Sequence, residues 1–188
     1  MKELSLNILD ITENSTRAGA TLVELTVDEQ PADDRLTITI ADNGRGMDVE
    51  LLAAVCDPFT TTRTTRKIGL GIPLFKEAAE SSGGSLSISS EPGVGTTVTA
   101  VFGYSHIDRM PLGDMAGTVS TIIQCHEAEC DFVYRHVFGR GEFTLDTREL
   151  REVMEDVPLS TPEVVFWIKE NIEENLRELY GGNKYENN

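Results

Sequence analysis

The chain has 188 residues, which is enough for one domain, or for one domain with a smaller appendage. Its 32 acidic and 16 basic residues give a formal net charge of -16, which argues against a nucleic-acid partner held through its phosphates. The sequence contains no apolar run long enough to span a bilayer and no signal peptide. It has three cysteines, and this odd number is typical of a protein in the reducing cytoplasm. We therefore expect a cytoplasmic protein without membrane attachment.

The first predicted element is a helix over residues 2–18, with Leu4, Ile8 and Ile11 on one face. Asn7, Asp10 and Asn14 form a second stripe at helical spacing, and Glu13 lies beside it. A carboxylate and an amide four residues apart on one helical face can hold hydrated Mg²⁺ and a nucleophilic water. The alternative is an ordinary solvated helix face.

A strand with alternating polarity over residues 36–40 leads into Ala41-Asp42-Asn43-Gly44-Arg45-Gly46-Met47. A carboxylate at a strand end can accept a hydrogen bond from an exocyclic amine such as N6 of adenine. Gly44 and Gly46 permit a sharp turn and the close approach of a ligand, and Met47 offers an adaptable surface to a flat ring. An Asp-Asn-Gly hairpin turn is the competing interpretation.

A short helix is expected over residues 48–55, followed by a polar loop over 57–67 that contains several Thr, Arg and Lys residues. Gly69-Leu70-Gly71 then opens a helix, and the unpaired N–H groups of a helix start favour phosphate. The loop is expected to close over that phosphate as a lid, or else to be a plain surface loop. Strands around residues 86–88 and 96–102 follow. The simplest packing is an α+β fold, a two-layer sandwich of a mixed sheet with helices on one face.

Four motifs in this order resemble the Bergerat-fold ATP-binding domain of gyrase B, heat-shock chaperones, histidine kinases and mismatch-repair ATPases. They are Glu13-Asn14-Ser15 with Ala18-Gly19-Ala20, then Asp42 to Met47, then Gly69-Leu70-Gly71, and finally Gly93-Val94-Gly95-Thr96-Thr97. The resemblance covers residues 1–104. The first motif is similar to the mismatch-repair version, whereas residues 57–84 are similar to histidine kinases.

The resemblance implies that Asn14 coordinates Mg²⁺, that Asp42 binds the adenine amine, and that the lid spans Thr60 to Lys67. The residues that it places against ATP are Asn14, Asp42, Gly44, Gly46, Met47, Thr61, Thr62, Arg63, Lys67, Gly69, Leu70, Gly71 and Thr97. Members that activate water carry a Glu one turn before the Asn, where this chain has Asp10. Asp10 and Glu13 are therefore the candidate catalytic residues, and efficient hydrolysis is in question.

The second half is predicted to be a small α+β extension over residues 105–180, followed by a disordered tail over 181–188. It holds a helix over 112–124, strands over 131–138 and 142–146, a short helix over 147–157, and a last helix from Pro162. That last helix has an apolar stripe of Val165, Ile168, Ile172, Leu176 and Leu179. Its expected role is dimerisation, giving a homodimer, or docking of a partner protein, although packing onto the ATPase sheet is equally compatible with the pattern.

Two further sequence patterns could have a function, but each also has a plain structural explanation. His106-Ile107-Asp108-Arg109-Met110-Pro111-Leu112 is similar to a phosphoacceptor box, but it also fits a connector that leaves the last strand. A metal site could be formed by Cys125, His126, Cys130 and His136, but their spacing lacks the second closely spaced ligand pair of a typical zinc site. Buried cysteines are the ordinary alternative.

The chain is thus predicted to be a Mg²⁺-dependent ATP-binding regulatory protein that transfers phosphoryl groups as a kinase or ATPase and acts on a partner protein. A stand-alone domain of this kind resembles anti-sigma-factor kinases. The alternative is a non-catalytic ATP sensor that signals through lid closure and the second half.

Overall fold

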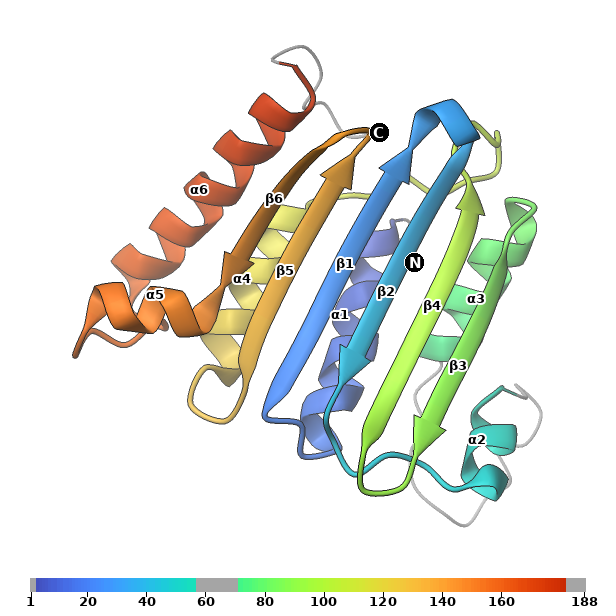
Figure 1. The fold of residues 1–188 in the computed structure, drawn as a ribbon, viewed down its shortest axis with the longest axis horizontal. Coiled ribbons are helices and arrows are strands. Elements are labelled where there is room, and N and C mark those ends of the chain that lie inside the picture. Colours follow the sequence, from blue (N-terminus) through green and yellow to red (C-terminus); the bar gives the residue numbers. More distant parts are fainter. Residues whose placement is uncertain (1–2, 57–70, 182–188) are drawn as a thin grey trace.

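The computed structural model describes residues 3–56 and 71–181. Six strands form one sheet in the order β3-β4-β2-β1-β5-β6 (Figure 1). All neighbouring strands are antiparallel except β1 and β5, which are parallel. The strands are β1 Leu22–Gln30, β2 Arg35–Asp42, β3 Ser85–Glu91, β4 Gly95–Gly103, β5 Asp131–Phe138 and β6 Gly141–Asp146.

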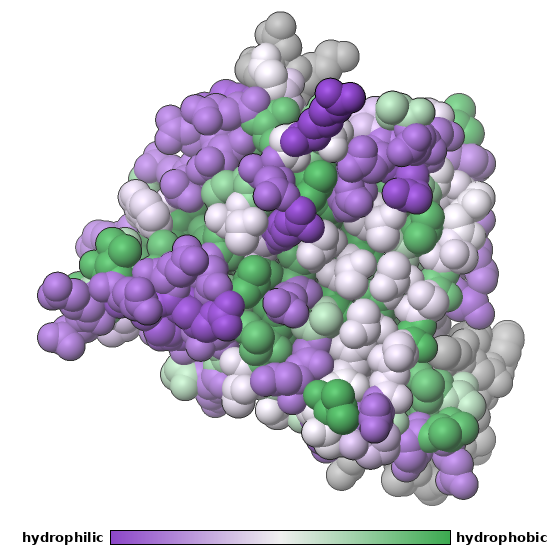
Figure 2. Space-filling view, viewed as in Figure 1, coloured by the Kyte–Doolittle hydropathy of each residue, from purple (hydrophilic) through white to green (hydrophobic). Residues whose placement is uncertain are grey.

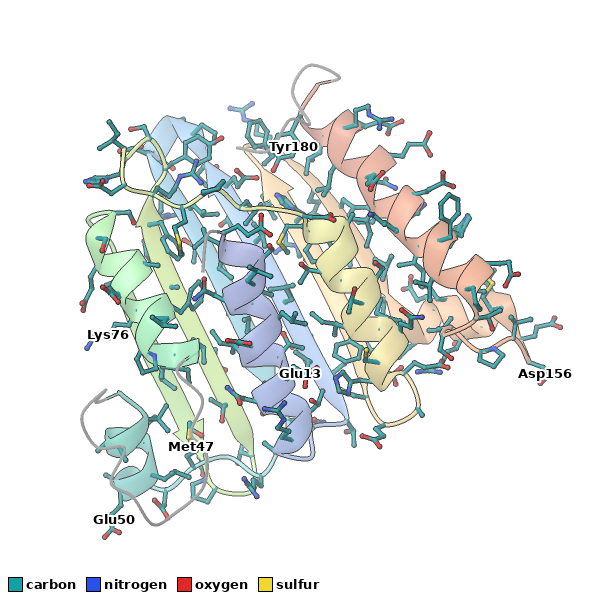
Figure 3. The ribbon with its side chains drawn as sticks, turned by 180° about the vertical axis from the view of Figure 1, so that it is seen from behind. Glu13, Met47, Glu50, Lys76, Asp156 and Tyr180 are labelled. Carbon is teal, nitrogen blue, oxygen red and sulfur yellow. The ribbon has the colours of Figure 1, made fainter. Side chains whose placement is uncertain are left out.

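Four helices cover one face of this sheet. Figure 3 shows them side by side in the order α3, α1, α4 and α6, and neighbours in this order are in contact. Their bounds are α1 Leu4–Arg17, α3 Gly71–Ser81, α4 Met115–His126 and α6 Pro162–Leu179. The shorter α2 Val49–Cys56 and α5 Thr147–Met154 and the 3-10 turn Pro31–Asp33 complete the described elements. None of these helices is long and apolar enough to cross a membrane.

The core lies between the helices and the sheet because each central strand alternates between buried and half-exposed residues. In β2 the buried side chains are Leu36, Ile38 and Ile40, and they face the helices. The intervening Thr37 and Thr39 lie on the other face, which none of the helices in residues 3–56 and 71–181 covers. In Figure 2 much of this face over β2, β3 and β4 is pale, meaning intermediate hydropathy. The predicted two-layer arrangement with helices on one face is confirmed.

The second half of the chain extends this sheet. β5 pairs with β1 along its length, and β6 returns beside β5 through a hairpin at Gly139-Arg140-Gly141. Of the alternatives left open by the sequence, packing onto the sheet is therefore confirmed. The boundary at residue 104 and a docking role for residues 105–180 stay predictions, and the predicted tail, apart from Gly181, lies outside the described residues.

Two helix assignments need correction. α4 begins at Met115 and not at Leu112, because the Asp114 side chain caps it by accepting a hydrogen bond from the Gly117 N–H at 2.7 Å. The buried stripe of α6 starts at Val164, not at Val165, and continues through Ile168, Ile172 and Leu176. This stripe packs on α4 and β6.

Candidate nucleotide-binding site

The carboxylate of Asp42, at the end of β2, is held from two sides. Ser15 on α1 donates its hydroxyl to Oδ2 at 2.6 Å, and the Gly44 N–H donates to Oδ1 at 2.9 Å. Each carboxylate oxygen has a further lone pair. Asp42 is therefore fixed in orientation and can still accept a hydrogen bond from a ligand. Ser15 belongs to the first sequence motif, which gives it no role; the structure places it on the buried side of α1, next to Asp42.

The loop after Asp42 is attached to both neighbouring elements. The Arg45 N–H donates to the Ala18 carbonyl at 3.0 Å, and the Arg45 carbonyl accepts from the Gly93 N–H at 2.8 Å. The Met47 N–H donates to the Ser90 hydroxyl at 2.8 Å. These bonds join the end of α1 to the β3–β4 turn through the loop. Met47 itself packs against the edge of the core.

The two loop glycines are required by the protein's own packing. Gly46 has φ +64°, and a Cβ there would lie 2.0 Å from the Glu91 carbonyl oxygen. A Cβ on Gly44 would lie 3.1 Å from the Ala18 Cβ. The predicted role, close approach of a ligand, stays a prediction, since the contacts described here are with the chain itself.

Asn43 is a second residue that sequence reasoning missed. Its Oδ1 accepts from the N–H groups of Thr21 and Leu22 at 2.8 and 3.0 Å, and its Nδ2 donates to the Thr21 hydroxyl at 2.9 Å. This amide ties the turn after β2 to the start of β1. These bonds join residues 21 and 22 positions apart, so no local pattern marks them; the Asx-type bond of this turn is instead that from the Gly44 N–H to Asp42.

The polar stripe of α1 faces the start of α3. A Cβ on Gly71, the first residue of α3, would lie 3.1 Å from the Asp10 Cβ and 3.5 Å from its Oδ2. Asn14 is half-buried one turn further along α1. Asn7 is fully buried, and neither atom of its amide has a hydrogen-bond partner among the described residues. The structure thus places Asp10 beside Gly71, the first residue of α3.

Glu13 is directed toward α4. Its Oε1 accepts a hydrogen bond from His126 Nε2 at 2.7 Å, and its Oε2 accepts from Arg17 at 3.3 Å. Figure 3 shows Glu13 on the α4 side of α1. A catalytic role for Glu13 stays a prediction, and its carboxylate already has two protein partners.

Thr97 and Thr96 lie on opposite faces of the sheet. Val98 and Ala100 of β4 are buried under the helices, so alternation places Thr96 on that face and Thr97 on the uncovered one. Thr96 pairs with Asp42 across the strands, and its hydroxyl is 2.9 Å from that of Ser90. Thr96, not the predicted Thr97, therefore shares a face with Asp42.

The remaining predicted nucleotide contacts, Thr61, Thr62, Arg63, Lys67, Gly69 and Leu70, lie outside the described residues. Residues 106–112 leave the far end of β4. Since a strand rises about 3.4 Å per residue, His106 lies roughly 25 Å from the level of Thr96. Among the described residues, no group of three or more metal-ligating side chains lies together. His126 instead contacts Glu13, and His136 is buried against Glu29.

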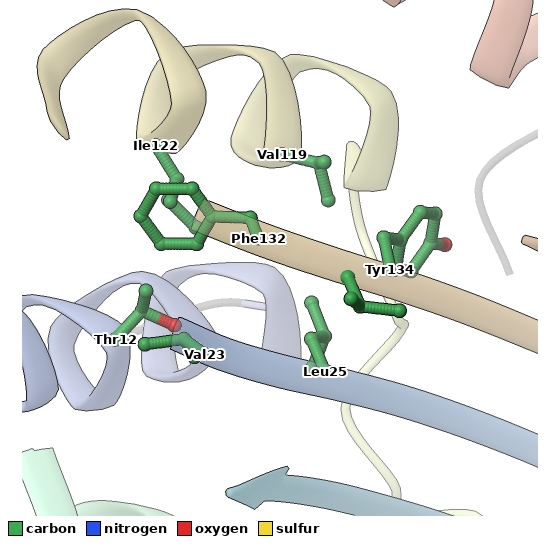
Figure 4. A pocket seen from close by; sticks show the side chains of 8 residues that line it. Thr12, Val23, Leu25, Val119, Ile122, Phe132 and Tyr134 are labelled. Carbon is green, nitrogen blue, oxygen red and sulfur yellow. The ribbon is translucent and has the colours of Figure 1, made fainter. Parts of the chain in front are cut away.

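A small apolar pocket lies between α1, α4, β1 and β5 (Figure 4). Its lining includes Thr12, Leu25, Val119 and Phe132, and its volume of about 10 Å³ leaves room for one water molecule at most. It is therefore separate from the Asp42 region and is too small for a nucleotide.

Comparisons with known proteins agree with this geometry. Residues 1–105 match the family of histidine kinase-, DNA gyrase B- and HSP90-like ATPases. The chain is 33% identical over 115 residues to the non-motile and phage-resistance protein of Caulobacter vibrioides, covering 58% of this chain and 14% of that protein. It is 32% identical over 102 residues to the signal transduction histidine-protein kinase AtoS of Escherichia coli, covering 54% and 16%.

The chain thus spans about one sixth of the length of these two relatives. The solved N-terminal domain of a DNA repair protein superimposes with a TM-score of 0.52 and 14% identity, covering 78% of this chain and 53% of that chain, and this likeness concerns the fold alone. Because the family match covers more than half of the residues, the chain belongs to the histidine kinase-, DNA gyrase B- and HSP90-like ATPases.

Proposed function

We propose that this chain binds ATP with Mg²⁺ and uses the nucleotide to regulate a partner protein, by phosphoryl transfer or hydrolysis. The observation that carries the proposal is the Asp42 carboxylate, which Ser15 and Gly44 hold at 2.6 and 2.9 Å at the end of a core strand. A fixed acceptor at this position suits the 6-amino group of adenine. Thr96 lies on the same face and replaces Thr97 in the proposed pocket.

The polar stripe of α1 fits a hydrated divalent cation. Asn14 offers an amide oxygen and Asp10 a carboxylate, and hard cations such as Mg²⁺ prefer oxygen ligands. When bound, Mg²⁺ would supply charge neutralisation of the phosphates. Asp10 lies beside the start of α3, whose N–H groups favour an anion. We propose Asn14 as the metal ligand and Asp10 as the residue that orients water.

The partner that we propose is a separate protein that accepts the phosphoryl group. The curated relatives include sensor histidine kinases, but the matched segment covers only 16% and 21% of two of them. Phosphorylation of a separate protein, as in anti-sigma-factor kinases, is the form of activity that we propose. The lid predicted over Thr60 to Lys67 belongs to the same proposal.

A non-catalytic ATP sensor is the second candidate, and the contact between Glu13 and His126 favours it. Glu13 precedes Asn14 on α1, and its carboxylate binds a residue of α4 from the second half of the chain. A nucleotide that shifts α1 would therefore act directly on α4 without any chemical step. Asp10 has a shorter side chain than the Glu of hydrolytic relatives, which also favours this candidate.

Nucleotide binding tests the proposal most directly. We expect Asp42→Asn to weaken ATP binding about tenfold or more, because a hydrogen bond to a charged group contributes about 1.5–3 kcal/mol. The wild type should prefer ATP to GTP, which lacks the 6-amino group, and the variant should lose this preference. Asp28→Asn is the matched control, because Asp28 lies on β1 on the uncovered face. Equal affinities for wild type and Asp42→Asn would refute the assigned pocket.

Incubation with γ-labelled ATP and Mg²⁺ then separates the two candidates. Label released as phosphate, or transferred to protein, supports catalysis. Binding without any release or transfer, in the presence of cell extract as a source of acceptors, supports the sensor.

A further inference from the structure

The outward face of α6 combines two aromatic side chains with three carboxylates. Phe166 and Trp167 are 60% and 43% exposed. Glu163, Glu170 and Glu174 lie three to eight residues from these two aromatic residues, on the same exposed side of the helix. We call these five residues the acidic-aromatic face.

This face is the outer flank of the helical layer. α6 is the last helix in the row, with α4 as its only helical neighbour in that layer among the described elements (Figures 1 and 3). The opposite side of α6, with Val164, Ile168 and Ile172, is buried against α4 and β6. The apolar stripe that the sequence suggested for docking is therefore already covered, and the aromatic pair is what α6 presents to solvent.

The charges around the face determine what it can bind. Lys169, the basic residue nearest in sequence to the aromatic pair, lies 3.7 Å from both Asp114 and Glu173, on the side toward α4. The helix therefore supplies carboxylates beside the rings, while that lysine is already paired and the exposed Arg177 lies ten residues beyond Trp167, in the last turn of α6. An aromatic ring face attracts a cation, above all the guanidinium group of Arg, and neighbouring carboxylates strengthen the attraction.

Charge also distinguishes between occupants. A second copy of this chain would bring another acidic face, and the net charge of -16 opposes such pairing. Nucleic acids and anionic lipid surfaces are repelled for the same reason. A segment that carries Arg or Lys beside apolar residues is complementary in both respects.

We propose that the acidic-aromatic face of α6 docks a basic amphipathic segment of a partner protein. Arg or Lys side chains of that segment lie over Phe166 and Trp167 and pair with Glu163 and Glu170. The proposal rests on the geometry of α6 and does not depend on nucleotide binding.

Trp167 is the only tryptophan of the chain, so its fluorescence reports directly on this face. The experiment titrates the full chain with a synthetic amphipathic helix bearing Arg and Leu, and with the same peptide carrying Glu in place of Arg. We expect a saturable change in Trp167 emission with the Arg peptide alone. Each cation over a ring contributes about 0.5–1 kcal/mol at an exposed site, so Phe166→Ser should weaken binding about two- to fivefold.

Charge reversal provides the second variant. Glu163→Lys with Glu170→Lys should weaken binding of the Arg peptide about tenfold or more, whereas Glu178→Lys, two turns beyond Glu170 on the same helix, should change it far less. Raised salt should weaken binding to the wild type because exposed charges are screened. Absence of any response, an equal response to the Glu peptide, unchanged binding by the Glu163→Lys/Glu170→Lys variant, or self-association through this face would each overturn the proposal.

Discussion

Replacement of Gly46 by Ala tests how the loop after β2 holds the candidate site. Gly46 has φ +64°, and its missing Cβ would fall 2.0 Å from the Glu91 carbonyl oxygen and 2.6 Å from its carbon. Gly93 has a similar φ of +76°, but a Cβ there would meet nothing within 4 Å. Both Ala variants pay about 1–2 kcal/mol for a left-handed backbone. Gly46→Ala adds the cost of moving the backbone of β3, typically about 1–3 kcal/mol for overpacking.

We therefore expect Gly46→Ala to lower the free energy of unfolding by about 2–5 kcal/mol and Gly93→Ala by about 1–2 kcal/mol. Urea denaturation followed by circular dichroism measures both. ATP binding is then measured without urea, at a temperature where both variants are folded. Affinity should fall more in Gly46→Ala, because that loop orients Asp42 through Gly44. Equal losses in the two variants, in stability and in affinity, would refute the reasoning.

Two further predictions concern the second half of the chain. Burial raises the pKa of Glu127, but hydrogen bonds from Ser160 and the Leu159 N–H outweigh it and lower the pKa below its ordinary 4.5. The resulting stabilisation is present above pH 4.5 and is lost as the pH falls through the lowered pKa. Glu127→Gln should therefore lower the free energy of unfolding by about 1–3 kcal/mol at pH 7 and change it little in acid. Urea denaturation at several pH values measures this difference. Burial and nearby carboxylates raise the pKa of Cys130 to about 11. Iodoacetamide at pH 8 should therefore modify the exposed Cys125 and spare Cys130 in the folded protein. Peptide mapping by mass spectrometry measures the labelling, and equal labelling of the two cysteines would contradict the assigned burial.

Much of the fold follows from local patterns. Alternation in residues 36–40 predicts a half-buried strand and places Asp42 at its end, and the glycines around Arg140 predict the hairpin of β5 and β6. No local sequence pattern predicts which strand β5 pairs with. Its parallel pairing with β1 joins residues 109 positions apart, from Leu22 with Asp131 to Glu29 with Phe138, and depends on α4 packing beside α1.

Adjacent, chemically alike residues mark the other limit of sequence reasoning. Val164 and Val165 both suit an apolar stripe, and only the way α6 packs on α4 and β6 decides which of them is buried. Thr96 and Thr97 are likewise the same residue type, but their side chains point to opposite faces of the sheet. The register of β4 against β2 decides which of them faces the helices. Sequence reasoning singled out Asp42 because its chemistry is distinctive. It did not predict the bond from Ser15 to Asp42, because the partner of a hydroxyl is decided by packing.

The contact between Glu13 and His126 changes how the two halves of the chain are related. As a sequence, residues 105–180 look like an extension attached behind an ATPase domain. In the structure, α4 packs along α1, and His126 binds the carboxylate directly before Asn14, the proposed metal ligand. α6 packs on α4 in turn and carries the acidic-aromatic face on its far side. The helices α1, α4 and α6 thus form one continuous row of packing contacts between the proposed metal ligand Asn14 and the proposed docking face of α6.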